Sequence, residues 1–163
     1  MIFVFRHGLT SMCNVEKTPN QVRDVHMTSE GVKQVHQSVS NISNIDVIFC
    51  SNTLRTIETA EIIANKFNSE ILCDARLNNK DNYIENTYKF IKEVSTTYKN
   101  KNVCIVTHGR IIKLIRYIME NDFVPMSNEI KQLPGCEYGN YIALKHKEYM
   151  VNTFHTSSLI RST

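Results

Sequence analysis

Short, uninterrupted runs of apolar residues alternate along this chain with segments of helical periodicity, and this alternation constrains its fold more than any other feature. Such runs suit strands that are buried on both faces, as in a parallel sheet. The segments between them repeat apolar side chains every three or four residues, which is typical of amphipathic helices. The predicted strands span residues 2–5, 47–50, 70–73 and 103–107, and the predicted helices span residues 28–42, 54–67, 83–98 and 110–119.

Alternation of this kind indicates an α/β domain with a mainly parallel sheet. Residues 138–144 and 149–154 are predicted to form two further strands joined by a polar turn, which would add an antiparallel edge. A chain of 163 residues is long enough for one core of this type. We therefore expect a single domain over residues 1–163, a three-layer α/β/α sandwich with a mainly parallel central sheet and an antiparallel edge strand.

The charge and the apolar pattern argue against several classes of protein. With 19 basic and 16 acidic residues the net charge is only +3, so no nucleic-acid partner is expected. No apolar stretch approaches the roughly 20 residues that span a bilayer, and the N-terminus does not resemble a secretory signal, so no membrane association is expected. The five cysteines include no Cys-x-x-Cys pair, which favours reduced thiols and a cytoplasmic location. Neither a P-loop nor a His-Glu-x-x-His motif occurs, so no metal or cofactor is expected.

Polar clusters follow three of the predicted strands directly. Ligands of open α/β sheets bind at the carboxyl ends of the strands. If the three strands are parallel neighbours, Arg6, His7, Arg55 and His108 should therefore meet at one edge of the sheet. The clusters are Arg6-His7-Gly8, Ser51 to Arg55, and His108-Gly109-Arg110.

Two arginines and two imidazoles in one pocket suit phosphoryl chemistry. The forked donors of Arg6 and Arg55 match the geometry of a phosphate group. One imidazole could attack phosphorus and form a phosphohistidine, and the other could donate a hydrogen bond to the transferring group. The glycine after each histidine would let the backbone approach a ligand closely. Alone, each cluster has a simpler explanation, such as a turn or, for Ser51, a helix cap, so the prediction depends on their combination.

Taken in order, these motifs resemble those of the histidine phosphatase superfamily, the phosphoglycerate-mutase-like group. The resemblance covers most of the chain. It implies an α/β/α sandwich, a phosphohistidine intermediate on His7, a phosphate pocket of Arg6, Arg55 and His108, and no metal requirement. The matching segments are Arg6-His7-Gly8-Leu9-Thr10, Met27-Thr28-Ser29-Glu30-Gly31, Phe49-Cys50-Ser51 through Arg55 with Thr59-Ala60, and Val106-Thr107-His108-Gly109.

The chain departs from the pattern of this family beside its first motif. Leu9 stands where the family often has Glu or Gln. Cys13 stands where the pocket asparagine usually falls, and Asn14 could replace that asparagine if the loop carries one extra residue.

A larger departure concerns the proton donor. Members that use a glutamate acid often read Arg-Leu-Asn-Glu after the third strand, whereas this chain ends the same segment at Asn79. An amide cannot give up a proton near neutral pH. Asp81 and Glu85 are therefore the candidate acids, with solvated surface carboxylates as the alternative interpretation of both.

The short connection between Arg76 and the strand at residue 103 is similar to that of small bacterial phosphohistidine phosphatases, which also lack the glutamate. We expect a histidine-acid-type phosphatase, a metal-independent phosphoric monoester hydrolase that acts on phosphate esters or phosphoramidates through His7. Its partner would be a phosphorylated small molecule or a phosphoprotein. The sequence leaves the physiological substrate and the oligomeric state open.

Two alternatives remain. The missing acid and Leu9 are compatible with a phosphate-binding module of weak activity. The segment from Cys104 to Arg110 has the Cys-x₅-Arg spacing of cysteine phosphatases, which use a low-pKa thiolate. However, its β-branched residues favour a buried strand over a phosphate-cradling loop.

Overall fold

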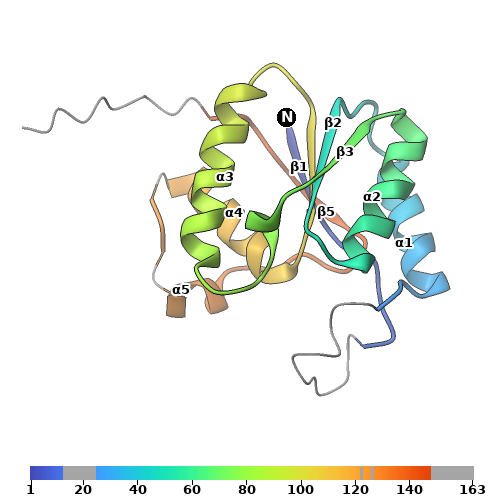
Figure 1. Cartoon of the computed structure of the whole chain (residues 1–163), viewed down its shortest axis with the longest axis horizontal. Coiled ribbons are helices and arrows are strands. Elements are labelled where there is room, and N and C mark those ends of the chain that lie inside the picture. The colour runs from blue at the N-terminus through green and yellow to red at the C-terminus, as the bar shows by residue number, and fades with distance from the viewer. Residues whose placement is uncertain (13–24, 122, 126, 148–163) are drawn as a thin grey trace, which may run out of the picture.

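The computed structural model describes residues 1–12, 25–121, 123–125 and 127–147, and its centre is a five-stranded sheet (Figure 1). The strand order is β3-β2-β4-β1-β5, with β1 and β5 antiparallel and the other neighbours parallel. The predicted mainly parallel sheet with an antiparallel edge is therefore confirmed. The strands are β1 (Ile2–Arg6), β2 (Val47–Cys50), β3 (Glu70–Cys73), β4 (Val103–Thr107) and β5 (Tyr141–Leu144).

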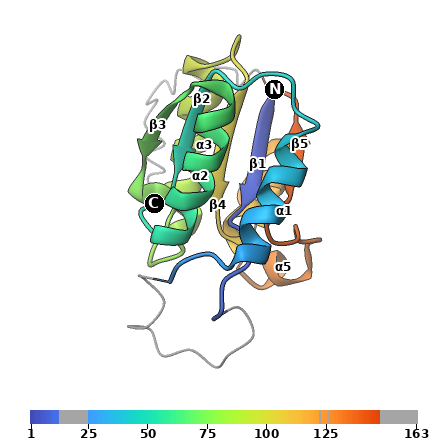
Figure 2. The same cartoon turned by 90° about the vertical axis from the view of Figure 1, so that its right-hand side faces the viewer.

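Helices cover both faces of this sheet, as predicted for an α/β/α sandwich (Figures 1 and 2). On one face lie α1 (Ser29–Val39) and α2 (Leu54–Phe67). On the other lie α3 (Tyr83–Thr97), α4 (Gly109–Asn121) and the short α5 (Ser127–Gln132). A 3₁₀ turn, η1 (Ala75–Leu77), connects β3 toward α3. Within the described ranges, no helix is long and apolar enough to cross a membrane.

Alternate residues of the central strands fill two separate cores, which explains why the apolar runs are uninterrupted. In β4, Ile105 packs toward α3 and α4, whereas Cys104 and Val106 pack toward α1 and α2. All five residues of β4 are buried. Burial of each large apolar side chain contributes roughly 1.5–3 kcal/mol, so both faces stabilise the central strands.

Some element boundaries differ from the sequence expectation. Helix α1 ends at Val39 rather than at residue 42, and α4 extends to Asn121. The edge strand begins at Tyr141 rather than at residue 138, because Gly139 turns the chain at φ +67° and donates its N–H toward the carbonyl oxygens of Arg6 and His7. The expected strand at residues 149–154 lies outside the described residues.

The start of α1 packs unusually closely on the loop that follows β1. Thr28 caps the helix by accepting a hydrogen bond from the Gly31 N–H at 3.1 Å. A Cβ atom at Gly8 would lie 2.5 Å from the Met27 sulfur and 2.8 Å from the Gly31 carbonyl oxygen. A Cβ at Gly31 would lie 2.6 Å from the Leu9 nitrogen. Gly8 and Gly31 therefore make room for chain packing, not for a ligand as the sequence suggested for Gly8.

We expect Gly31→Ala to lower the free energy of unfolding by about 1–3 kcal/mol, because the added methyl group meets backbone atoms that cannot move aside. Urea denaturation would measure this change. Gly135→Ala is the matched control, since its Cβ would meet only the Lys113 Cε atom, at 3.5 Å. The control should change stability by no more than about 0.5 kcal/mol. Equal urea midpoints for the two variants would contradict the packing argument.

Candidate active site

The parallel pairing of β1, β4 and β2 brings the three polar clusters to one edge of the sheet. Arg6 pairs with Thr107, and Cys50 pairs with Val106, so the three strands end at nearly the same level. The connections continue this pairing, since His7 N–H donates to the Thr107 carbonyl oxygen at 3.2 Å. The structure thus brings together the side chains of Arg6, His7, Arg55 and His108.

These four side chains line a cavity of about 800 Å³. Ligand cavities in proteins commonly measure about 300–1,000 Å³, so its size suits a small molecule or part of a larger one. Its charged lining consists of the cations Arg6, Arg55, Lys80 and Arg110 and a single carboxylate among the described residues, that of Asp81. The other residues that line it are His7, Thr10, Met12, Val25, Asn52, Thr53, Asn78, Asn79, His108, Gly109 and Tyr138.

Arg55 connects the two histidines. It lies in the first turn of α2 and is only 8% exposed. Its Nε donates to His7 Nε2 at 3.3 Å, and its Nη2 contacts His108 Nδ1 at 3.4 Å. The two imidazole rings lie 5.4 Å apart, measured between their centroids. A single guanidinium therefore sets the positions of both rings.

The hydrogen bonds also define which nitrogen of each histidine carries the proton. A carbonyl oxygen only accepts, so His7 Nδ1 donates to the Gly8 carbonyl oxygen at 2.9 Å. A guanidinium only donates, so His7 Nε2 and His108 Nδ1 are acceptors. His108 Nε2 then donates to Ser51 Oγ at 2.9 Å. His7 consequently presents the lone pair of Nε2 toward Arg55.

Ser51 has a different position from the one its sequence context suggested. The N-cap of α2 is Thr53, not Ser51. Ser51 is fully buried and holds His108, while Thr56 Oγ1 donates to its carbonyl oxygen at 2.7 Å. Its place beside the second histidine depends on pairing between β2 and β4, which the local sequence does not indicate.

Arg6 is held by residues far away in the sequence. Its guanidinium carbon lies 3.5 Å from the centre of the Tyr138 ring, and its Nη1 donates to the Cys136 carbonyl oxygen at 2.8 Å. The Tyr138 ring also lies 5.4 Å from the His7 ring. Sequence reasoning missed Tyr138 and Cys136, because they belong to the segment before β5 and only the β1–β5 pairing places them there.

The two candidate acids occupy different environments. Asp81 lines the cavity. Glu85 is exposed on the first turn of α3 and is not part of the lining; it pairs with Lys89 at 2.7 Å. That hydrogen bond lowers the pKa of Glu85 and holds its side chain to Lys89, outside the cavity. The geometry therefore argues against Glu85 as an acid.

Asn79 and Asn14 are the two other residues that the sequence analysis considered for the site. Asn79 lines the cavity, and its Oδ1 accepts a hydrogen bond from Arg110 at 3.4 Å. Asn14 lies outside the described residues. Among those that are described, no group of three or more His, Cys, Asp or Glu side chains could hold a metal ion.

Cys104 does not have the environment that a thiolate nucleophile needs. Its side chain is completely buried in the core between the sheet and α1 and α2. Desolvation raises the pKa of its thiol far above the usual value, and the neighbouring Cys50 adds to this effect. A reactive thiolate requires the opposite shift. This position argues against the cysteine phosphatase alternative.

Comparisons with known proteins agree with this fold. The family model described as histidine phosphatase superfamily (branch 1) matches residues 2–83, about half of the chain. No curated protein matches the sequence. Several solved structures share the fold at low sequence identity.

The alpha-ribazole phosphatase from Shigella flexneri has a TM-score of 0.68 at 16% identity, covering 86% of this chain and 87% of its own. The phosphoserine phosphatase from Entamoeba histolytica has a TM-score of 0.66 at 16% identity over 86% and 87%. An Agrobacterium tumefaciens protein described as a candidate phosphohistidine phosphatase, SixA, has a TM-score of 0.56 at 12% identity, covering 80% of this chain and 79% of its own.

We expect Cys104 to resist iodoacetamide in the folded protein at neutral pH, because the thiol is both buried and protonated. Cys73, which is exposed, is the internal control and should react. Peptide mass spectrometry after timed alkylation would measure both sites. Modification of folded Cys104 as fast as that of Cys73 would contradict the assignment of Cys104 to the core.

Proposed function

The chain belongs to the histidine phosphatase superfamily (branch 1), and from this premise we propose that it hydrolyses phosphate monoesters or phosphoramidates through a phosphohistidine on His7. The observation that carries the proposal is the pair of contacts on the His7 ring. Nδ1 donates to the Gly8 carbonyl oxygen at 2.9 Å, and Nε2 accepts from Arg55 at 3.3 Å. The nucleophilic lone pair is thus directed at the guanidinium that would bind a phosphate oxygen.

The proposed reaction has two displacements at phosphorus. His7 Nε2 first forms a bond to phosphorus while the bond from phosphorus to the leaving oxygen or nitrogen breaks, and the leaving group takes up a proton. Water then attacks phosphorus, the phosphorus–nitrogen bond breaks with its electrons returning to Nε2, and inorganic phosphate leaves. Arg6 and Arg55 hold the phosphoryl oxygens throughout.

His108 would stabilise the charge that develops on the transferring group. Its Nε2–H is anchored on Ser51 Oγ at 2.9 Å, which leaves Nδ1 on the side of Arg55. When His108 is protonated, this Nδ1–H can donate to a phosphoryl oxygen. Substrate would then replace the contact between Nδ1 and Arg55, and the donor would lower the barrier by stabilising negative charge as it develops on the phosphoryl oxygens.

The substrate class proposed is a phosphorylated small molecule or a phosphoprotein. The similar structures are described as alpha-ribazole, phosphoserine and phosphohistidine phosphatases, which supports a range of leaving groups on this fold. The connection from β3 to α3 contains only η1 and a short turn, and so leaves no room for a long capping segment there.

We expect His7→Asn to lower kcat by on the order of 10³-fold or more, because the variant cannot form the covalent intermediate. It should still bind inorganic phosphate through Arg6 and Arg55. Turnover of para-nitrophenyl phosphate and isothermal titration with phosphate would measure the two effects. Alkaline quenching during wild-type turnover should trap a phosphoryl group on the peptide that contains His7.

His26→Asn is the matched control for this experiment, since His26 is an exposed histidine paired with Glu58 at 2.5 Å. Full activity of His7→Asn, or a phosphoryl group trapped on another residue, would refute the covalent mechanism. Tight phosphate binding by the wild type without turnover of any aryl phosphate would instead support the phosphate-binding module, which the Asn79 amide at the usual position of the acid favours.

We propose Asp81 as the proton donor and expect its effect to depend on the leaving group. Asp81→Asn should lower kcat/KM for a sugar phosphate by about 10²-fold, because an alkoxide needs a proton as it leaves. Turnover of para-nitrophenyl phosphate should change little, since that leaving group is stable as an anion. Glu85→Gln is the control and should affect neither substrate. Equal rates of Asp81→Asn and wild type on the sugar phosphate would exclude Asp81 as the acid.

A further inference from the structure

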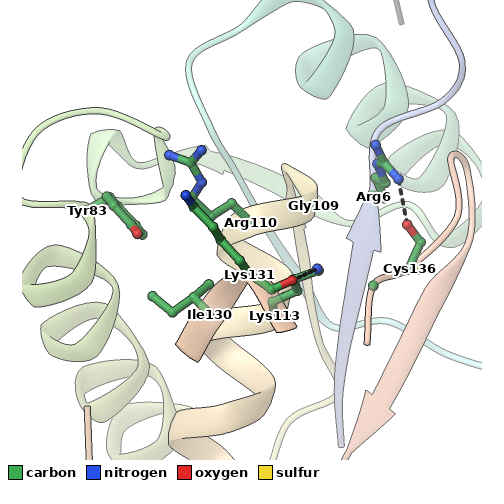
Figure 3. Close-up of a pocket in the computed structure, with 9 residues that line it drawn as sticks. Arg6, Tyr83, Gly109, Arg110, Lys113, Ile130, Lys131 and Cys136 are labelled. Atoms are coloured by element: carbon green, nitrogen blue, oxygen red, sulfur yellow. Dashed lines mark hydrogen bonds between the residues drawn. The ribbon is translucent and has the colours of Figure 1, made fainter. Parts of the chain in front are cut away.

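A second cavity, of about 700 Å³, adjoins the one that contains the histidines (Figure 3). The two cavities share Arg6, Gly109 and Arg110 as lining residues. The remaining lining comes from the start of α3, from α4 and α5, and from the segment before β5. These residues are Tyr83, Lys113, Ile130, Lys131, Gly135 and Cys136.

The charge of this second cavity is entirely positive. Four of its lining residues are cations, namely Arg6, Arg110, Lys113 and Lys131, and none of its described lining residues is acidic. None of the four forms an ion pair within the described ranges. Elsewhere in the described chain, Lys89 and Arg116 are each paired with a glutamate one helical turn away. Four cations and no acidic residue thus line one cavity beside the one that contains the histidines, within the described ranges.

Contacts to neutral groups hold several of these cations in place. Arg110 donates to Asn79 at 3.4 Å, and its guanidinium carbon lies 5.6 Å from the centre of the Tyr83 ring. Lys113 Nζ donates to the Lys131 carbonyl oxygen at 3.2 Å, which ties α4 to α5. Figure 3 shows Arg110 and Lys131 extending from their two helices in the direction of Tyr83.

Arg6 reaches the cavity from the opposite wall. Its Nη1 donates to the Cys136 carbonyl oxygen at 2.8 Å, and its Nε is buried without a hydrogen-bond partner in the described part of the chain. Like charges placed around one cavity repel one another, and an anion bound among them removes that cost. Tyr83 and the buried Ile130 add an apolar wall suited to the carbon skeleton that carries the anion.

We propose that this second cavity binds a second anionic group of the substrate, a carboxylate or a further phosphate carried by the leaving group. The inference rests on the proposed phosphatase function and narrows its substrate class to small phosphorylated molecules with a second acid group. Lys113 and Lys131 are the specificity residues. Arg6 and Arg110 line both cavities, and so lie between the second anion and the transferring phosphoryl group.

A matched set of aryl phosphates, with and without a carboxylate, tests the proposal. Phenyl phosphate has no second anion, whereas meta- and para-carboxyphenyl phosphate carry one at two positions. We expect the wild type to favour at least one carboxylated substrate in kcat/KM. Lys131→Gln and Lys113→Gln should each lower kcat/KM for that substrate by about tenfold, since each removes a charged donor, and should leave phenyl phosphate within about twofold. Lys131→Gln is the more informative of the two variants, because Lys131 contacts Lys113 through its backbone oxygen and the substitution leaves that contact in place.

The control is Lys99→Gln, because Lys99 lies on the exposed turn after α3, away from both cavities.

Binding experiments separate this inference from the catalytic proposal. The non-hydrolysable pair benzylphosphonate and para-(phosphonomethyl)benzoate reports the second site without turnover, and Lys131→Gln should weaken only the carboxylated ligand. If the wild type turned over no aryl phosphate but Lys131→Gln still weakened only the carboxylated ligand, the phosphatase function would be refuted and the anion site would be supported. The anion site would be overturned if Lys131→Gln weakened the carboxylated and uncarboxylated compounds equally. It would also be overturned if the wild type preferred the carboxylated compounds neither in kcat/KM nor in binding. Preference for an acidic phosphopeptide over both carboxyphenyl phosphates would overturn the small-molecule class.

Discussion

The parallel pairing of β1 and β2 on either side of β4 is the constraint on which the rest of this molecule depends. Because Arg6 pairs with Thr107 and Cys50 with Val106, residues far apart in the sequence end at one level of the sheet. Both faces of these strands are buried, so a shift in register would disrupt two cores at once. The stability of the sandwich and the geometry of the candidate active site therefore have the same origin.

Arg55 fixes the relative positions of the two histidine side chains within the candidate active site. It is almost completely buried and donates to Nε2 of one histidine and Nδ1 of the other. Arg55 thus contacts a different ring nitrogen in each of the two imidazoles. His7 keeps a lone pair at Nε2, and His108 is turned so that Nε2 points to Ser51. Chemically identical residues are made unequal by their hydrogen bonds alone.

The sheet and the two histidines could be predicted because their signals are local. Apolar runs mark buried strands, and a polar cluster at each strand end marks the ligand edge. The contacts of Ser51 and Tyr138 could not be predicted, because they arise from pairing between distant strands. The sequence predicts that Gly8 makes room for a ligand, whereas the atoms closest to it belong to Met27 and Gly31. Asp81 and Glu85 are both carboxylates near the start of one helix, so the sequence does not separate them, and only the tertiary structure places Asp81 in the cavity lining and Glu85 outside it.

The backbone of His7 is held from three directions. Its N–H donates to Thr107, its carbonyl oxygen accepts from Gly139 at 3.0 Å, and the next residue is pressed against the start of α1. A residue tied in this way loses its conformational freedom when the domain folds, not when a substrate arrives. The entropy cost of ordering the proposed nucleophile is thus met when the domain folds. Substrate binding energy is then not needed to order His7 and can stabilise the transition state instead. The rigidity of the fold around His7 would in this way increase the rate of the proposed reaction.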